Sequence, residues 1–282
     1  MVENRPWLSV ATHVVLIIGL VIVLFPIWVA FVASTHPADR FVSGVVPLLP
    51  GTHLIGNYAA VLGEGARQNG LPPVGPMLVN SLVMALGIAL GKIAISLISA
   101  FAIVYFRFPF RKIAFWIIFL TLMLPVEVRI VPTYQVIANL GMLNSYVGLT
   151  VPLIASATAT FLYRQFFLTI PDELAEAARI DGAGPWKFLK DIVIPLSRTS
   201  TAALFVILFI YGWNQYLWPL LVTTDPDYYT VVMGIQRAAR ATDQEPLWNL
   251  VMAVAMLALL PPVIVVLAMQ KLFVRGLVET EK

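Results

Sequence analysis

The feature that most constrains this chain is a series of long apolar runs separated by short charged segments. Several runs extend for about 20 residues, which as an α-helix is enough to cross a hydrocarbon core about 30 Å thick. The runs do not alternate between polar and apolar residues, so they do not resemble strands of a membrane barrel. The chain is 60% hydrophobic and 12% charged, well above the apolar share of soluble domains. These features predict an all-α, polytopic membrane helical bundle.

We expect six transmembrane helices in a single transmembrane domain over residues 1–282. The expected spans are 14–33, 78–105, 113–137, 147–167, 199–222 and 250–273. A proline, Pro125, should break the third span, because proline lacks a backbone N–H and clashes with the preceding helical turn. The polar stretch 35–76, rich in Gly and Pro, is expected to be an irregular external loop.

The orientation follows from how Lys and Arg are distributed between alternate segments. One set of segments carries Arg5, Arg107, Arg111, Lys112, Arg164, Arg179, Lys187, Lys190, Arg198, Lys271, Arg275 and Lys282. The other set carries only Arg40, Arg67, Arg129, Arg237 and Arg240. The positive-inside rule therefore predicts a multi-pass protein with both termini in the cytoplasm. The net charge of +3 is small and sorted by membrane side, so it does not indicate a nucleic-acid partner.

Enzyme chemistry is not indicated by the residues that usually carry it. The chain contains no cysteine, which excludes disulfides, thiolate metal sites and cysteine nucleophiles. Its histidines, His13, His36 and His53, lack metal-ligand spacing, and no Ser–His pair is apparent. We therefore expect no catalytic residues and no metal site, and an intramembrane hydrolase or acyltransferase is the weaker hypothesis.

A charged stretch, "EAARIDGAGPWKFLKDIVIP", lies in the predicted cytoplasmic loop at about 169–197. Within this loop, "IPDELAEAARI" predicts a short helix with Pro171 in its first turn and with Asp172 and Glu173 near the positive end of the helix dipole. Gly182 is expected to end this helix.

The second half of the stretch predicts another short helix. It would begin at Pro185, place Trp186, Leu189 and Val193 on one face, and stop at Pro195. Two short helices joined by a glycine turn form a rigid projection that suits a socket on another protein. A connecting loop with no partner remains the alternative.

The spacing of this segment resembles the EAA motif of bacterial ABC-importer permeases, whose loop docks in a cleft of the cytoplasmic ATPase. The matching positions are Glu176, Ala177, Ala178, Gly182, Ile192 and Pro195. The stretches "NSL", "FRFPFRK", "YGWNQYLWPL" and "QKLFVRGL" resemble MalG-type carbohydrate-importer permeases. "ENRPWL", "LPGTHL", "LMLPVEVRI", "ASATATFLYRQFF" and "FVRGLVETEK" are similar to the permease subunits of sn-glycerol-3-phosphate importers. Two departures, Thr199 in place of a frequent proline and the tail 279–282, lie outside the motif core.

The resemblance implies a type I ABC importer permease in a bacterial inner membrane. Its partners would be a homologous second permease subunit, two ATP-binding cassette ATPase subunits and an extracytoplasmic solute-binding protein. ATP and Mg would bind to the partner ATPase, and this chain would hold no cofactor. Its only Gly–Lys pair, Gly91–Lys92, lies in an apolar span and is followed by Ile93, unlike a phosphate-binding loop.

The resemblance also implies roles within the coupling loop. Glu176 and Asp181 would make polar or ionic contacts in the ATPase cleft, while Ala177 and Ala178 would allow close approach. Gly182 would supply the turn. ATP-driven closure of the ATPases would then move the loop as a lever and open the spans outward, by alternating access.

Charged residues within the spans indicate where the cargo would pass. Lys92 lies near the middle of the second span, where a lysine costs on the order of 2.5 to 3.5 kcal/mol on insertion scales. Glu127 and Arg129 follow the break at Pro125. Lys92 and Arg129 suit an anionic phosphate ester, since Arg can donate two hydrogen bonds to phosphate oxygens. A structural ion pair with Glu127, or an interfacial position for Arg129, is the alternative.

Polar residues outside these charges complete the candidate set. In the fifth span we expect Asn214, Gln215 and Tyr216 to face the pathway and Trp218 to belong to the interfacial aromatic belt. By resemblance, the predicted external loop with Arg237 and Arg240 should touch the solute-binding protein, although an ordinary solvated loop fits equally.

The implied cargo is sn-glycerol-3-phosphate or a glycerophosphodiester such as glycerophosphocholine. The nearest alternative is the same machine importing a neutral sugar or oligosaccharide. A secondary transporter working without ATP is disfavoured because no inverted repeat is apparent.

Overall fold

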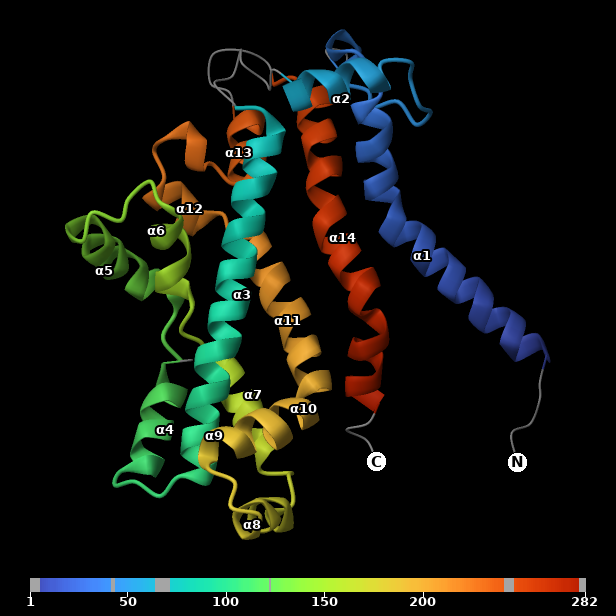
Figure 1. Ribbon diagram of the computed structural model, residues 1–282. Coiled ribbons are helices and arrows are strands. Elements are labelled where there is room, and N and C mark those ends of the chain that lie inside the picture. The colour runs from blue at the N-terminus through green and yellow to red at the C-terminus, as the bar shows by residue number, and fades with distance from the viewer. Residues whose placement is uncertain (1–5, 42–43, 64–71, 122, 241–245, 279–282) are drawn as a thin grey trace. The chain divides into compact units, whose positions relative to one another are not determined.

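The computed structural model describes residues 6–41, 44–63, 72–121, 123–240 and 246–278 (Figure 1). Throughout these ranges the regular structure is helical, with no strand, which confirms the all-α prediction. Contacts divide the chain into two compact units, one of residues 1–76 with 234–260 and one of 77–233 with 261–282. That residues 1–282 act as one transmembrane domain stays a prediction.

The first unit is built around two long apolar helices. Its helices are α1 (Pro6–Ser34), η1 (Ala38–Phe41), α2 (Leu54–Gly63), the end of α13 (Val231–Ala239) and the start of α14 (Trp248–Val278). The stretch 35–76, expected to be irregular, contains the helices η1 and α2, so that expectation was wrong.

A buried asparagine explains why α2 forms in this polar stretch. The Asn57 side-chain nitrogen donates to the backbone oxygens of Ser34 and His36, both at 2.8 Å. Asn249 donates to the Asn57 side-chain oxygen at 3.0 Å. The amide thus satisfies carbonyls at the end of α1, which would be costly to bury unpaired.

The second unit contains the remaining helices. They are α3 (Val74–Tyr105), α4 (Arg111–Leu120), α5 (Val126–Asn139), α6 (Tyr146–Thr150), η3 (Val151–Leu153), α7 (Ala157–Phe167), α8 (Asp172–Ile180), α9 (Pro185–Phe188), η4 (Leu189–Val193), α10 (Ile194–Leu196), α11 (Arg198–Trp213), α12 (Leu217–Val222) and η5 (Pro226–Tyr228). Figure 1 shows α5, α6 and α12 beside the first half of α3, and α4, α7 and α9 at its other end. The core between α3 and the former group is formed by Met84, Ile88, Ile137, Leu149, Trp218 and Val222.

Three helices, α1, α3 and α14, are each long and apolar enough to cross a membrane. Two further candidates are bent pairs: α6–η3 with α7, bent by 48°, and α9–α10 with α11, bent by 73°. The predicted break in the third span is confirmed, because α4 ends at Leu120 and α5 begins directly after Pro125. The total of six spans stays a prediction.

Proline 195 does not stop the second short helix of the coupling loop, contrary to the sequence prediction. The helix passes through a π-turn at η4, and Pro195 lies inside the following α10. A π-turn changes which carbonyl faces the proline ring, so the clash that normally breaks an α-helix is relieved. The chain instead bends after Leu196, before α11.

Candidate functional site

Lys92 lies in the middle of α3 and is only 7% exposed. Its ammonium nitrogen lies 3.9 Å from the centroid of the Tyr211 ring on α11, a cation–π contact. The buried cation therefore faces another helix of the second unit rather than lipid, as the cost of a charge in hydrocarbon requires.

A cavity of about 120 Å³ adjoins this lysine. Arg129 on α5 lines the same cavity, so two cations from separate helices meet in one space. No acidic side chain is among its described lining residues. The Glu127 side chain, expected as a counter-ion, lies outside the described residues. The cavity therefore offers positive charge to a small anion.

Hydrogen-bonding groups flank the two cations. The Gln215 amide nitrogen donates to the Tyr211 backbone oxygen at 3.2 Å, which fixes this amide at the cavity wall. Thr133 donates to the Arg129 backbone oxygen at 2.7 Å and also lines the cavity. Amide, phenol and hydroxyl groups beside two cations can bind the hydroxyls of a phosphorylated polyol.

The backbone break between α11 and α12 brings Gln215 to this cavity. Irregular backbone is tolerated inside a membrane protein where it lines a cavity or is buried in protein. Trp218, after the break, is 4% exposed and donates from its indole nitrogen to the Gly148 backbone oxygen at 3.0 Å. Its predicted place in an interfacial aromatic belt was wrong, because the indole anchors α12 inside the second unit.

Two glycines allow α3 to pack closely against its neighbours around the cavity. A Cβ on Gly212 of α11 would lie 2.9 Å from the Ala85 Cα atom on α3. A Cβ on Gly91 would lie 2.6 Å from the Ile154 Cγ2 atom. Gly91 next to Lys92 is therefore a helix-packing residue, which agrees with the absence of a phosphate-binding loop motif there.

The structure brings together some of the predicted pathway residues and not others. Lys92, Arg129 and Gln215 line one cavity, whereas Asn214 and Tyr216 are not among its lining residues. Tyr211 and Thr133 line it but were not predicted. Tyr211 precedes Gln215 by four positions, and Thr133 follows Arg129 by four. Residues four apart lie on one helical face, so this spacing could have indicated Tyr211 and Thr133.

The first helix of the coupling loop, α8, ends just before Gly182, as predicted. Gly182 has a φ of +71°, and its N–H donates to the Arg179 oxygen at 3.0 Å, while the Ala183 N–H donates to the Ala178 oxygen at 2.8 Å. These two bonds form a Schellman motif, in which glycine avoids the steric cost of a left-handed backbone. Glu176 and Asp181 are exposed beside this turn.

The remaining motif positions differ in exposure. Ala177 is exposed, whereas Ala178 is buried within the chain, so only the former is open to a partner. Ile192 and Pro195 are half-buried. The most exposed large apolar side chains of the loop are Ile180, at 85% exposure, and Trp186, at 74%.

The second short helix is fixed to α3 through its other face. Phe188, Leu189 and Val193 are buried, and the Phe188 ring lies edge-on to Tyr105 with centroids 5.1 Å apart. The prediction that Trp186, Leu189 and Val193 share one face was wrong, because Trp186 is exposed while the other two are buried. Ile180 of the same loop is also exposed.

The two arginines expected to meet a binding protein, Arg237 in α13 and Arg240 just after it, are both exposed. The neighbouring acidic residues Asp243 and Glu245 lie outside the described residues. Contact with a binding protein stays a prediction.

The amino-acid sequence is similar to that of known transport proteins. Residues 92–279 match the family described as "Binding-protein-dependent transport system inner membrane component". The chain is 58% identical over 282 residues, covering 100% of both proteins, to the sn-glycerol-3-phosphate transport system permease protein UgpE of Escherichia coli strain K12. The proteins of the same name from Escherichia coli O157:H7 and Shigella flexneri serotype 5b are 59% and 58% identical over the same length.

Solved structures show the fold. A chain of a bacterial ABC transporter involved in the import of the acidic polysaccharide alginate matches with a TM-score of 0.81 at 20% identity, covering 96% of this chain and 98% of that one. A second alginate ABC transporter, in complex with its alginate pentasaccharide-bound periplasmic protein, matches with a TM-score of 0.61 at 15% identity, over 94% and 93% of the two chains.

Proposed function

This chain belongs to the family of binding-protein-dependent transport system inner membrane components, and we propose that it is the permease subunit that conducts sn-glycerol-3-phosphate in an ATP-driven importer. The observation that carries the cargo assignment is the cavity lined by Lys92 and Arg129. A phosphate monoester carries up to two negative charges at neutral pH, and two cations in one cavity match it. Glycerophosphodiesters, with one negative charge on the phosphate and the same glycerol unit, form the second cargo class.

In this proposal each described polar group of the cavity has a role. The Arg129 guanidinium can bind two phosphate oxygens, while Lys92, held over the Tyr211 ring, supplies a point charge. Gln215 and Thr133 would bind the glycerol hydroxyls. Lys92 and Arg129 together would attract an anionic cargo as it passes through the cavity. No described carboxylate lines the cavity to neutralise either cation.

The family membership supports a complex of several subunits around this chain. A homologous second permease would complete the pathway, and two ATPase subunits would bind ATP and Mg and receive the loop through Glu176, Asp181, Ile180 and Trp186. This chain would hydrolyse no ATP and hold no cofactor. An extracytoplasmic solute-binding protein would deliver the cargo near Arg237 and Arg240, with both termini of this chain in the cytoplasm.

Transport by alternating access requires the loop to move as one body. The Schellman turn at Gly182 and the packing of Phe188 on Tyr105 connect the exposed surface of the loop to α3, which carries Lys92. Closure of the ATPases would thus reach the helix that lines the cargo cavity, because a packed helix transmits displacement.

The test is uptake by vesicles that hold the complete reconstituted complex and its binding protein. Radiolabelled sn-glycerol-3-phosphate, glycerophosphocholine and maltose are compared with and without internal ATP. We expect ATP-dependent uptake of the phosphorylated compounds and none of maltose. Uptake of maltose alone would overturn the cargo assignment, and uptake of any compound without ATP would overturn the ATP-driven mechanism.

A further inference from the structure

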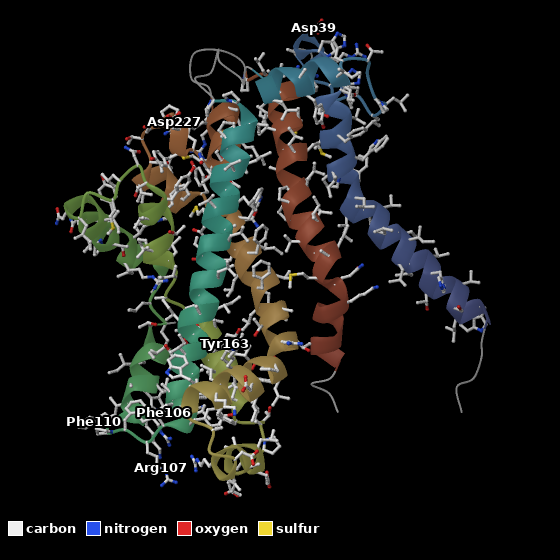
Figure 2. The ribbon with its side chains drawn as sticks, in the orientation of Figure 1. Asp39, Phe106, Arg107, Phe110, Tyr163 and Asp227 are labelled. Carbon is white, nitrogen blue, oxygen red and sulfur yellow. The ribbon has the colours of Figure 1, made fainter. Side chains whose placement is uncertain are left out.

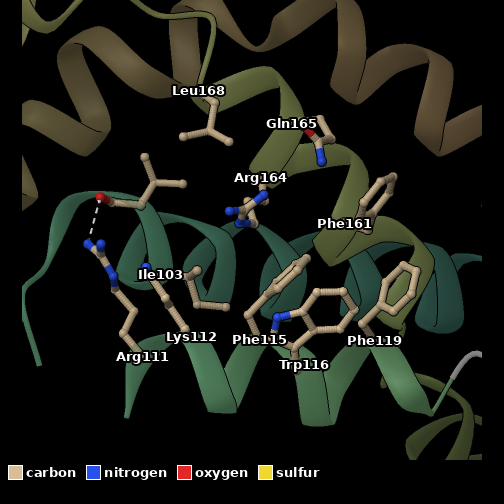
Figure 3. A pocket seen from close by; sticks show the side chains of 11 residues that line it. Ile103, Arg111, Lys112, Phe115, Trp116, Phe119, Phe161, Arg164, Gln165 and Leu168 are labelled. Atoms are coloured by element: carbon tan, nitrogen blue, oxygen red, sulfur yellow. Dashed lines mark hydrogen bonds between the residues drawn. The ribbon is translucent and has the colours of Figure 1, made fainter. Parts of the chain in front are cut away.

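A second, larger cavity of about 400 Å³ lies at the end of α3 that carries Tyr105, where α4 packs against α7 (Figure 3). It is separate from the cargo cavity and shares no lining residue with it. Three cations line it: Arg111 and Lys112 at the start of α4, and Arg164 on α7. The distribution of Lys and Arg predicts that this end faces the cytoplasm.

Two of the three cations are held in place by contacts that involve no described carboxylate. Arg111 donates to the backbone oxygens of Phe106 at 3.2 Å and Val104 at 3.5 Å. The Arg164 guanidinium carbon lies 4.3 Å from the centroid of the Phe115 ring. Lys112 makes no hydrogen bond to a described residue, and no described carboxylate lines the cavity. The cavity is thus a positively charged site whose fixed arginines leave a lysine available to an anion.

Aromatic side chains line the cavity beside the cations. Phe115 stacks on Phe119 and Phe161, with ring centroids 6.1 Å and 6.5 Å apart, and Trp116 also lines the cavity (Figure 3). The Trp116 side chain is more than half exposed, and Ile113 and Ile117 on the same helix are exposed as well. The cavity therefore continues into an apolar helix surface.

The loop before α4 adds exposed aromatic side chains at the same end. Phe108 and Phe110 are exposed, and Phe110 has a φ of 63°, which is uncommon for a bulky residue. Figure 2 shows Phe106, Arg107 and Phe110 at the opposite end of the second unit from Asp227. Phenylalanine and arginine side by side are typical of a segment that lies at a membrane–water interface.

We propose that this cavity binds the headgroup of an anionic phospholipid of the cytoplasmic leaflet, with the acyl chains lying along the exposed apolar surface of α4. The cations match the phosphate, as in basic pockets between transmembrane helices. A free phosphate would use the same cations, but it would make no use of the apolar surface that continues from them. The assignment does not depend on which cargo the importer carries.

The experiment measures lipid binding by the complete complex in detergent, using native mass spectrometry. Phosphatidylglycerol is the probe, and phosphatidylethanolamine is the zwitterionic comparison. Lys112→Gln and Arg164→Gln each remove one cavity cation, and each should weaken phosphatidylglycerol binding by about five-fold. Arg107→Gln is the matched control, because it removes an exposed cation of the same loop that does not line the cavity.

Equal retention of both lipids by the wild type, or equal losses in Arg107→Gln and Lys112→Gln, would overturn the proposal. Displacement of the phospholipid by millimolar inorganic phosphate would identify a free-anion site and overturn it too. Lys112→Gln removes no hydrogen bond, so it remains informative if Arg164→Gln fails to assemble. Wild-type rates of uptake in the control confirm that the complex is intact.

Discussion

At the residue scale, Lys92 is a buried cation, which is costly for stability, and it also lines the cargo cavity. We expect Lys92→Met to keep or raise the thermal midpoint of the purified complex, because a buried cation is removed from α3. We expect the same variant to lower uptake of sn-glycerol-3-phosphate at least ten-fold, since the cavity loses half of its described cations. A drop in the thermal midpoint together with normal uptake would instead identify a structural lysine.

The second residue-scale prediction concerns Gly212. An alanine there would press its Cβ against the backbone of α3 at Ala85, which cannot move as a side-chain end can. We expect Gly212→Ala to destabilise the complex by about 1 to 3 kcal/mol, the usual cost of overpacking. Gly75→Ala on α3 is the control, because a Cβ there meets nothing within 4 Å. Equal thermal midpoints for both variants would contradict the close packing.

The sequence identified the charged members of the site because a charge in an apolar span is costly wherever it lies. Tyr211 and Thr133 were not identified, although each lies four residues from a predicted site residue, because periodicity in these largely apolar spans does not by itself show which face turns inward. Trp218 was misassigned for a related reason. Its place near a helix end is shared by interfacial and buried tryptophans, and only the tertiary contact with Gly148 separates them.

At the element scale, the coupling loop depends on its glycine turn. Gly182→Val should strain the left-handed turn by roughly 1 to 2 kcal/mol and tilt the exposed surface of the loop. We expect the complex to assemble but to hydrolyse more ATP for each molecule imported. Gly184→Val is the control, because Gly184 has a φ of −70°, which valine adopts without strain. Unchanged coupling in Gly182→Val would remove the turn from the mechanism.

Trp186 is a large, exposed apolar side chain of the coupling loop. Trp186→Ala should weaken association with the ATPase by at least about 2 kcal/mol, because buried tryptophans dominate interface energies. The readout is the amount of ATPase that co-purifies with the permease over a salt and detergent series. Lys190→Ala, an exposed change on the same segment, should have little effect. Equal loss in both variants would place the ATPase contact elsewhere.

Local signals predicted the ends of elements where one residue decides them. Pro125 lies at the break between α4 and α5, and Gly182 follows the end of α8. In both cases the backbone conformation of one residue determines where the helix begins or ends. Pro195 was misjudged because the π-turn before it removes the clash on which the rule depends. Trp186 was misjudged because the π-turn at η4 changes the helical spacing on which a common face with Leu189 and Val193 depends.

At the scale of the whole molecule, the sequence predicted the fold class through apolar runs and their charged borders. It did not predict that the cargo cavity combines parts of α3, α5, η3, α11 and α12. These elements are far apart in sequence, and their contacts depend on small residues such as Gly91 and Gly212 whose partners are known only from the packing. Composition thus predicted the helical membrane fold and the motif resemblance predicted the permease family, while the packing brings Lys92 and Arg129 to one cavity.

The most direct test of the account is the kinetics of sn-glycerol-3-phosphate uptake by Arg129→Gln in reconstituted complexes. A charged hydrogen bond to phosphate contributes on the order of 1.5 to 3 kcal/mol, so we expect uptake efficiency to fall about ten- to hundredfold. Arg107→Gln, the same change outside both cavities, should transport like the wild type. Wild-type efficiency in Arg129→Gln would contradict the claim that the anion passes between Lys92 and Arg129.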